Sequence, residues 1–348
     1  RRILYEASLI ILFGVAAALC ISGVTYLIQR PTLARFSKEY EGKSLQTQVA
    51  VAETYLRTFS AAALNGAIEA QNAEGFCHSQ THGLGRAVYK KYPNLSDAIR
   101  QCGTSCTYGC FHGVLMEMFS TDSDTLGGAV EEETPDAYLA AVQRSASDLC
   151  AKPEVANEVH ARYCYHGIGH VFGFIAGTDL DKGLASCAIY KNDHAWRYCR
   201  SGVFMEYLFS PETVLVLNSR GPAPCDAYPD QGKCFRYKAY GWINIWGGIA
   251  PALAGCGSFG ESELLCISNV AEAAATPVLL STSEGIETIC GTLTGEKKSV
   301  CVDGALNKII DLNNGDDSEH VCDIVAPEYR ARCLDVRTRY EADVYFTH

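Results

Sequence analysis

The chain has 348 residues, 48% of them hydrophobic, which is enough apolar material for a large buried core. Its formal net charge is -11, and no basic block offsets this charge. The chain therefore lacks the cluster of positive charge that binding to a phosphate backbone requires, which excludes nucleic acid as a partner. Seventeen cysteines are too many to remain free thiols in an oxidising compartment and indicate a disulfide-rich protein.

The first predicted element is an apolar segment near the N-terminus. Residues 8–28, SLIILFGVAAALCISGVTYLI, form a run of 21 residues without a charge, long enough as a helix to cross a hydrocarbon core. A cleaved signal peptide, the alternative, would have a shorter apolar core. We therefore predict a transmembrane anchor over residues 1–30, with the membrane as a partner.

The distribution of charge does not decide which end of the predicted transmembrane helix is cytoplasmic, because basic residues stand on both sides of this segment. The cysteines favour an oxidising compartment for the rest of the chain. The N-terminus is thus expected in the cytoplasm and residues 31–348 in the periplasm or outside the cell. Residues 33–71 are rich in Ala, Leu, Glu and Gln and contain few breakers, which predicts a stalk helix within residues 31–75.

The cysteines after residue 149 form six successive pairs whose members are 9 to 14 residues apart. Longer stretches rich in Ala, Leu, Ile and Val separate the pairs and are predicted to be helices. Each pair is expected to form a disulfide that joins two helices across a turn. The pairs are Cys150/Cys164, Cys187/Cys199, Cys225/Cys234, Cys256/Cys266, Cys290/Cys301 and Cys322/Cys333.

Four further cysteines, Cys77, Cys102, Cys106 and Cys110, belong to the first repeat. Four cysteines allow three connectivities, and the spacing does not choose among them. Zinc ligation by some of these cysteines is the alternative, but Cys-x-x-Cys spacing is absent.

Glycine stands three residues after a repeat cysteine at Gly113, Gly202 and Gly304. Because glycine is unfavourable in a helix, its recurrence here predicts that two helices approach closely.

Sequence patterns typical of β-strands are sparse. The predicted fold is all-α: an α-solenoid of antiparallel helix pairs, stapled by disulfides, follows the anchor and stalk. Residues 76–210 would form the first two repeats and residues 211–348 the C-terminal repeats.

Two of the repeats share a pattern of histidines. The motif His-x-x-x-His occurs at His78/His82 and at His166/His170. Residues four apart on a helix lie on the same face, so both imidazoles of a pair can bind one metal ion. Further on, CFHGVLMEMF and CRSGVFMEYLF each supply one glutamate, and the first also contains a histidine. The predicted metal ligands are His78, His82, His112, Glu117, His166, His170 and Glu206.

Imidazole and carboxylate ligands from neighbouring helices are typical of zinc, iron or manganese sites. Methionines beside the two glutamates would favour copper, unless they are simply core residues. The predicted cofactor is a divalent metal ion such as zinc, iron or copper. The alternative for the histidines is structural, since histidines of helical repeats also cap helices and bond to buried carbonyls.

Signatures of common enzymes are missing from the sequence: there is no nucleophile elbow, phosphate loop or dinucleotide fingerprint. If Glu117 or Glu206 does not bind the metal, it could act as a general base.

The sequence supports two hypotheses about function. The first is a membrane-anchored, extracytoplasmic helical-repeat protein that binds a metal. The second is a structural subunit of a membrane complex or surface filament, with protein partners bound through the solenoid surface or the N-terminal helix.

Overall fold

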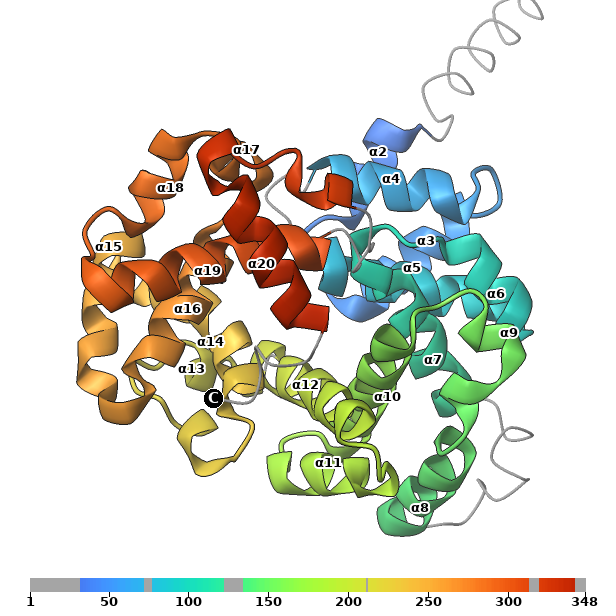
Figure 1. Ribbon diagram of the computed structural model, residues 1–348. Helices are drawn as coiled ribbons and strands as arrows, with labels where there is room; N and C mark the ends of the chain where they lie inside the picture. Colours follow the sequence, from blue (N-terminus) through green and yellow to red (C-terminus); the bar gives the residue numbers. More distant parts are fainter. Residues whose placement is uncertain (1–31, 72–76, 122–133, 211, 313–318, 342–348) are drawn as a thin grey trace, which may run out of the picture.

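The computed structural model describes residues 32–71, 77–121, 134–210, 212–312 and 319–341 of the chain (Figure 1). Within these ranges the regular structure is entirely helical and contains no strand, as predicted. The proposed anchor segment, residues 8–28, lies outside the described ranges. Among the helices that the structure does describe, none combines the length and hydropathy that a membrane crossing requires.

Residues 32–71 form three short helices, so the prediction of one long stalk helix is wrong. They are α2 (Leu33–Tyr40), α3 (Leu45–Tyr55) and α4 (Ala61–Gln71). The chain leaves α2 in an extended conformation at Glu41, and Gly42 follows with a φ of 64°. Phe36 and Leu64 are fully buried, and α3 packs on the helix Cys77–Lys91, which is α5. The apolar residues of this segment therefore extend the core.

The remaining helices follow one another along the chain. They are α5 (Cys77–Lys91), α6 (Leu95–Cys102), α7 (Gly109–Thr121), α8 (Pro135–Ala146), α9 (Pro153–Ala156), α10 (Ala161–Ala176), α11 (Leu180–Ser186), α12 (Asp193–Phe209), α13 (Val214–Leu217), α14 (Gln231–Trp246), α15 (Ile249–Gly255), α16 (Glu263–Ala274), α17 (Pro277–Leu280), α18 (Ser283–Cys290), α19 (Gly295–Leu312) and α20 (Arg330–Glu341). Short 3-10 turns connect several of them, among them η1 (Cys106–Tyr108).

The long helices pack against one another in chain order, α5 on α7, then α10, α12, α14, α16, α19 and α20. In a simple solenoid each repeat contacts only its neighbours. Here the array closes on itself near the end of α19. Asp311 forms an ion pair with Arg236 of α14 at 2.7 Å, and its carbonyl oxygen accepts a hydrogen bond from Tyr163 of α10 at 3.5 Å. In Figure 1, α20 lies between the α14–α18 part of the molecule and the α2–α7 part.

All six predicted sequential cysteine pairs are disulfides, which confirms that part of the prediction. The connectivity that the sequence left open is Cys77–Cys106 and Cys102–Cys110. The second of these joins the end of α6 to the start of α7. The first holds η1 beside the start of α5, a position that matters for the site described below.

The repeat glycines bring paired helices into backbone contact, as predicted. A Cβ atom at Gly113 of α7 would lie 2.0 Å from the carbonyl oxygen of His82 on α5. A Cβ atom at Gly202 of α12 would lie 2.0 Å from the carbonyl oxygen of His166 on α10. These distances leave no room for any side chain, so glycine is required at both positions.

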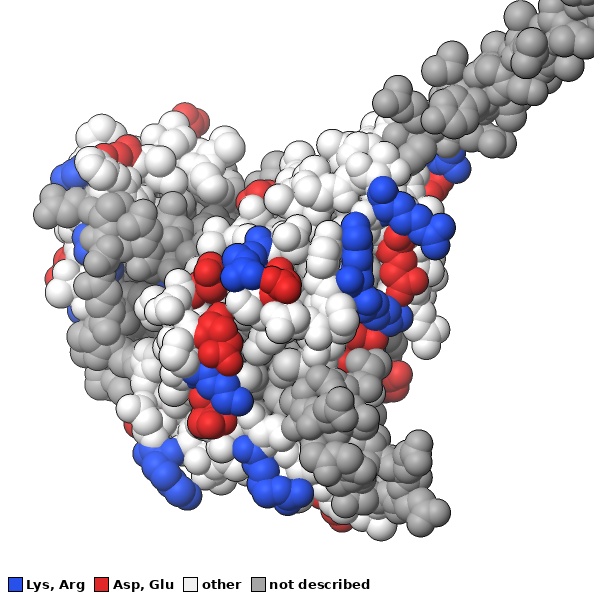
Figure 2. Space-filling view, turned by 90° about the vertical axis from the view of Figure 1, so that its right-hand side faces the viewer, with Lys and Arg blue, Asp and Glu red and all other residues white. Residues whose placement is uncertain are grey.

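The described surface carries basic and acidic residues in close association. Figure 2 shows Lys and Arg side chains beside Asp and Glu side chains on one face of the molecule. Examples of such ion pairs are Arg35 with Glu39 at 2.6 Å and Lys90 with Glu53 at 3.0 Å. Pairs of this exposed kind contribute little to stability, about 0 to 1 kcal/mol each.

Candidate metal centre

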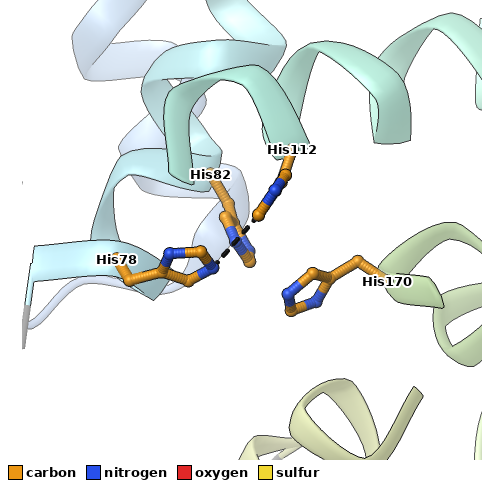
Figure 3. Close-up of side chains that lie close together, drawn as sticks. All are labelled: His78, His82, His112 and His170. Carbon is orange, nitrogen blue, oxygen red and sulfur yellow. Dashed lines mark hydrogen bonds between the residues drawn. The ribbon is translucent and has the colours of Figure 1, made fainter. Parts of the chain in front are cut away.

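Four histidines from three helices converge on one point in the interior. One ligand nitrogen from each of His78, His82, His112 and His170 lies within 4.8 Å of the other three (Figure 3). The first two histidines come from α5, the third from α7 and the fourth from α10. The structure therefore brings His170 of the second predicted pair to both histidines of the first pair, although the two pairs are separated by more than eighty residues in the sequence.

Small residues allow these helices to approach closely enough for the rings to meet. The contact of Gly113 with His82 brings α7 against α5. A Cβ atom at Gly167 of α10 would lie 2.7 Å from the His112 ring, so this glycine makes room for the imidazole between α7 and α10. His78 and His82 are one helical turn apart and share a face of α5, with ring centroids 5.1 Å apart.

Two of the imidazoles are oriented by backbone carbonyl oxygens. His78 places its Nδ1 atom 3.2 Å from the carbonyl oxygen of Cys106, and His112 places its Nε2 atom 2.8 Å from that of Tyr163. A carbonyl oxygen only accepts, so each of these ring nitrogens is the one that carries the proton. The Cys77–Cys106 disulfide holds the first of these acceptors next to α5.

The positions of the ring protons determine which nitrogen atoms present a lone pair to the centre of the group. A neutral imidazole carries one proton, so Nε2 of His78 and Nδ1 of His112 both present lone pairs. These two atoms lie 3.1 Å apart. Without a proton between them the lone pairs repel each other, whereas a cation placed between them would bind both. The two carbonyl bonds thus fix the tautomers that a metal ion needs.

The other two histidines complete the arrangement. Nδ1 of His170 lies 2.9 Å from a carboxylate oxygen of Glu206, which leaves Nε2 of His170 with its lone pair. Nε2 of His82 is buried and has no hydrogen-bond partner. A buried polar atom without a partner is costly, and a metal ion would supply the missing one.

Burial keeps these rings in the neutral form that binds metals. Desolvation lowers the pKa of His78 to about 3 and holds the pKa values of His82 and His112 well below the ordinary value. Nearby histidines, His170 among them, lower the three values further. All three are therefore deprotonated at neutral pH and need no proton release on binding.

The two glutamates of the predicted site have different surroundings. Glu206 contacts His170, an arrangement in which a carboxylate orients a metal-binding imidazole. Glu117 instead pairs with Arg86 at 2.7 Å and with Lys90 at 3.8 Å, and lies outside the four-histidine group. The two glutamates, which were both predicted to be metal ligands, thus differ in their partners in the structure.

His166 stands beside the group and is not one of its four members. Its Nε2 atom lies 3.2 Å from Nε2 of His170, and its ring centroid is 5.2 Å from that of His112. Burial, together with the neighbouring His170, His112 and Arg236, lowers its pKa well below the ordinary value. It is therefore a neutral neighbour that can donate to, or join, the site.

The first two repeats align with each other differently from the alignment that the His-x-x-x-His motif suggested. The carbonyl oxygen of His82 meets Gly113, and that of His166 meets Gly202, so His82 corresponds to His166. Sequence reasoning missed this correspondence. The signal was present as His-Gly-Leu-Gly at residues 82–85 and His-Gly-Ile-Gly at residues 166–169.

In this alignment Arg86 corresponds to His170, and Glu117 corresponds to Glu206. The first repeat thus has a partly buried Arg–Glu ion pair at the place where the second repeat has a His–Glu pair. The substitution of arginine for histidine explains why only one of the glutamates contacts a member of the histidine group.

Two hollows adjoin the histidine group. An inner cavity of about 90 Å³ is lined by His78 and His166, together with residues of α12, α14 and α19. A larger cleft of about 570 Å³ is lined by His82, His170 and Glu206. An ion held by the four histidines would therefore have space on both sides.

Comparison with protein-family models, curated proteins and solved structures gave no match to this chain. The residues themselves define the class: a helical, disulfide-rich protein with a histidine cluster that could hold a metal ion.

Proposed function

We propose that the protein binds one divalent transition-metal ion through His78, His82, His112 and His170. The observation that carries the proposal is the orientation of the four rings. Three of them use one nitrogen to bond a carbonyl or carboxylate oxygen, and the fourth has a buried nitrogen with no partner. The other nitrogens of His78 and His112 point lone pairs at each other across 3.1 Å, an arrangement that is unfavourable for a protein core without a cation.

The donor set narrows the choice of metal. Four imidazole nitrogens suit zinc, copper or iron, whereas magnesium and calcium prefer oxygen ligands. All cysteines in the described part of the chain are in disulfides, so no thiolate is offered to a soft metal there. Zinc(II), copper(II) and iron(II) are therefore the proposed ions.

Metal binding, not catalysis, is the function that the geometry supports best. Glu206 is engaged by His170 and Glu117 by Arg86, so neither carboxylate is placed as a general base that acts on a metal-bound molecule. The cleft beside His82 and His170 would give an ion a route in and out. The rival proposal of a purely structural subunit gives no reason for the arrangement of the rings.

The proposed location is outside the cytoplasm, with residues 8–28 as a membrane anchor. Eight disulfides support an oxidising compartment. The apolar run of residues 8–28 supports the anchor by its length and its lack of charge. Protein partners would bind the surface of the helical array or the N-terminal segment.

Elemental analysis of the full chain, produced in an oxidising compartment and purified without chelator, tests the proposal. We expect about one zinc, copper or iron atom per chain. The variant His112→Ala should lose most of this metal, whereas His320→Ala, at an exposed histidine outside the group, should keep it. The proposal fails if the wild type, offered each of the three ions, binds none, or if both variants bind metal equally well.

A further inference from the structure

The inner cavity beside the metal centre has an unusual concentration of buried positive charge. Arg162 of α10, Arg236 of α14 and Lys308 of α19 all line it. Arg162 and Lys308 are each only 5% exposed. Buried cations need compensating negative charge, because removing a charge from water is costly.

Two carboxylates compensate part of this charge. Arg236 bonds Glu272 at 2.5 Å and Asp311 at 2.7 Å. Lys308 donates a hydrogen bond to the hydroxyl of Tyr240 at 3.1 Å. Among the described residues that line the cavity or form printed ion pairs with its cations, three positive charges stand against two carboxylates.

These groups keep their charges. Burial by itself would lower the pKa of Lys308, but Tyr240, Asp311 and Glu272 raise it on balance. Burial by itself would raise the pKa of Asp311, but Arg236 and Lys308 lower it on balance. The excess positive charge is therefore present at neutral pH.

A metal ion in the adjoining site would add to this excess. Imidazole ligands bring no charge to a divalent ion, and within the part of the chain that the structure describes Glu206 is the only carboxylate paired with a member of the group. The ion and Glu206 together would leave one more positive charge next to the cavity. Such a buried excess favours a bound anion.

We infer that the cavity binds a small anion, a carboxylate or an inorganic oxyanion, beside the metal ion. The cavity volume of about 90 Å³ suits a ligand of a few heavy atoms. Besides the cations, hydroxyl groups line the cavity, such as those of Ser201 and Tyr237, which lie 2.8 Å apart. The inference rests on the proposed metal site, because the metal supplies part of the charge.

The test uses the full chain loaded with cobalt(II), whose visible absorption reports its ligand environment. Equilibrium dialysis first measures how much cobalt binds. Acetate, phosphate and acetamide are then titrated separately. Acetate and phosphate represent the two anion classes, and acetamide has the shape of acetate without its charge. We expect acetate or phosphate to shift the spectrum and to bind at least tenfold more tightly than acetamide.

Three lysine variants show whether the anion occupies this cavity. Lys308→Met removes a lining charge and should weaken anion binding at least tenfold. Lys308→Arg keeps the charge and should retain binding. Lys298→Met makes the same change on the same helix at a residue paired with Glu287, outside the cavity, and should leave binding unchanged.

The outcomes separate the two proposals. If the chain binds no cobalt and none of the proposed ions, the metal site itself is wrong. If cobalt binds but neither anion changes the spectrum or is preferred over acetamide, the anion site alone is wrong. Equal loss of anion binding in Lys308→Met and Lys298→Met would also contradict the assignment to this cavity.

Discussion

Nδ1 of His112 lies 3.1 Å from Nε2 of His78, and both nitrogens are left without a proton by the carbonyl bonds on the far sides of their rings. Two nitrogen ligands of a tetrahedral zinc ion, each about 2.0 to 2.1 Å from the metal, would be about 3.3 Å apart. The two rings are thus already separated by nearly the distance that a shared metal ion requires.

The matched glutamates of the two repeats give a direct test of what orients the site. Glu206→Gln removes the charged partner of His170 and should weaken metal affinity about 10- to 100-fold. Glu117→Gln changes the equivalent residue of the first repeat, which pairs with Arg86 instead. That variant should unfold at a lower temperature but bind metal as the wild type does. Metal titration and thermal unfolding of both variants measure the difference, and equal metal affinities would contradict this assignment.

Gly113 and Gly202 should be intolerant of even one added methyl group. Alanine at either position would place a Cβ atom 2.0 Å from a carbonyl oxygen of the paired helix. We expect Gly113→Ala and Gly202→Ala each to lower the free energy of unfolding by about 3 kcal/mol or more, the upper part of the range for overpacking. Urea denaturation provides the measurement.

Gly66→Ala is the matched control for these two variants. Gly66 lies within α4, and an added Cβ atom there would meet no other atom within 4 Å. Because alanine favours the helix by about 1 kcal/mol over glycine, this variant should be as stable as the wild type or more so. Similar losses in all three variants would show that the close helix contacts are not what makes the repeat glycines necessary.

The sequence predicted those features of the fold that depend on local spacing. The six sequential disulfides follow from cysteines 9 to 14 residues apart, and the close helix contacts follow from recurring glycines such as Gly304. Prediction failed for residues 33–71, where the composition suits one long helix. The short breaks near Gly42 and Phe59 let this segment fold against α5, where the hydroxyl of Tyr40 donates a hydrogen bond to the carbonyl oxygen of Gln80. Composition alone does not reveal this packing.

For the site, the sequence identified the histidines but not the role of each neighbour. The motif singled out His78, His82 and His170, and the structure brings these three together with His112, the extra predicted ligand. Glu117 could not be told apart from Glu206, because the difference depends on whether Arg86 or His170 faces the glutamate. The charged cavity was not predicted, since α19 reaches it only because the array closes on itself.

Peptide mapping of the oxidised protein should distinguish the three possible connectivities of the first repeat. We expect peptides that link Cys77 to Cys106 and Cys102 to Cys110. Removal of a sequential disulfide should also reduce stability. Replacement of both Cys150 and Cys164 by serine opens a loop of 14 residues and should cost about 3 kcal/mol in the chain-entropy model. Linkage of Cys77 to Cys102 or Cys110 would overturn the assigned pairing.

The metal-free protein should lose stability in mild acid. His82 and His112, like His78, have folded pKa values below the ordinary value of 6.5, so they take up protons only when the chain unfolds. Below pH 6.5 the unfolded state gains protons that the folded state lacks. The free energy of unfolding should therefore fall as the pH decreases from 6.5 toward 3, the pKa of His78, by up to about 1.4 kcal/mol per pH unit for each histidine.

Chelator-treated protein, unfolded with urea at several pH values, measures this dependence. Acid also protonates carboxylates that form ion pairs, so a comparison is needed. The variant His82→Gln removes one of the buried imidazoles and should show a flatter decline between pH 6.5 and pH 4.5. An unchanged slope in this variant would mean that the buried histidines do not account for the acid sensitivity.

X-ray absorption spectroscopy at the metal edge of the loaded protein tests the central claim most directly. We predict a first shell of nitrogen atoms at about 2.0 to 2.1 Å if zinc is bound, with the outer-shell scattering typical of several imidazole rings. This scattering should weaken in His78→Ala and His112→Ala and stay unchanged in His320→Ala. A spectrum of the wild type without imidazole scattering, or one dominated by sulfur or by water oxygen, would contradict a metal centre built from His78, His82, His112 and His170.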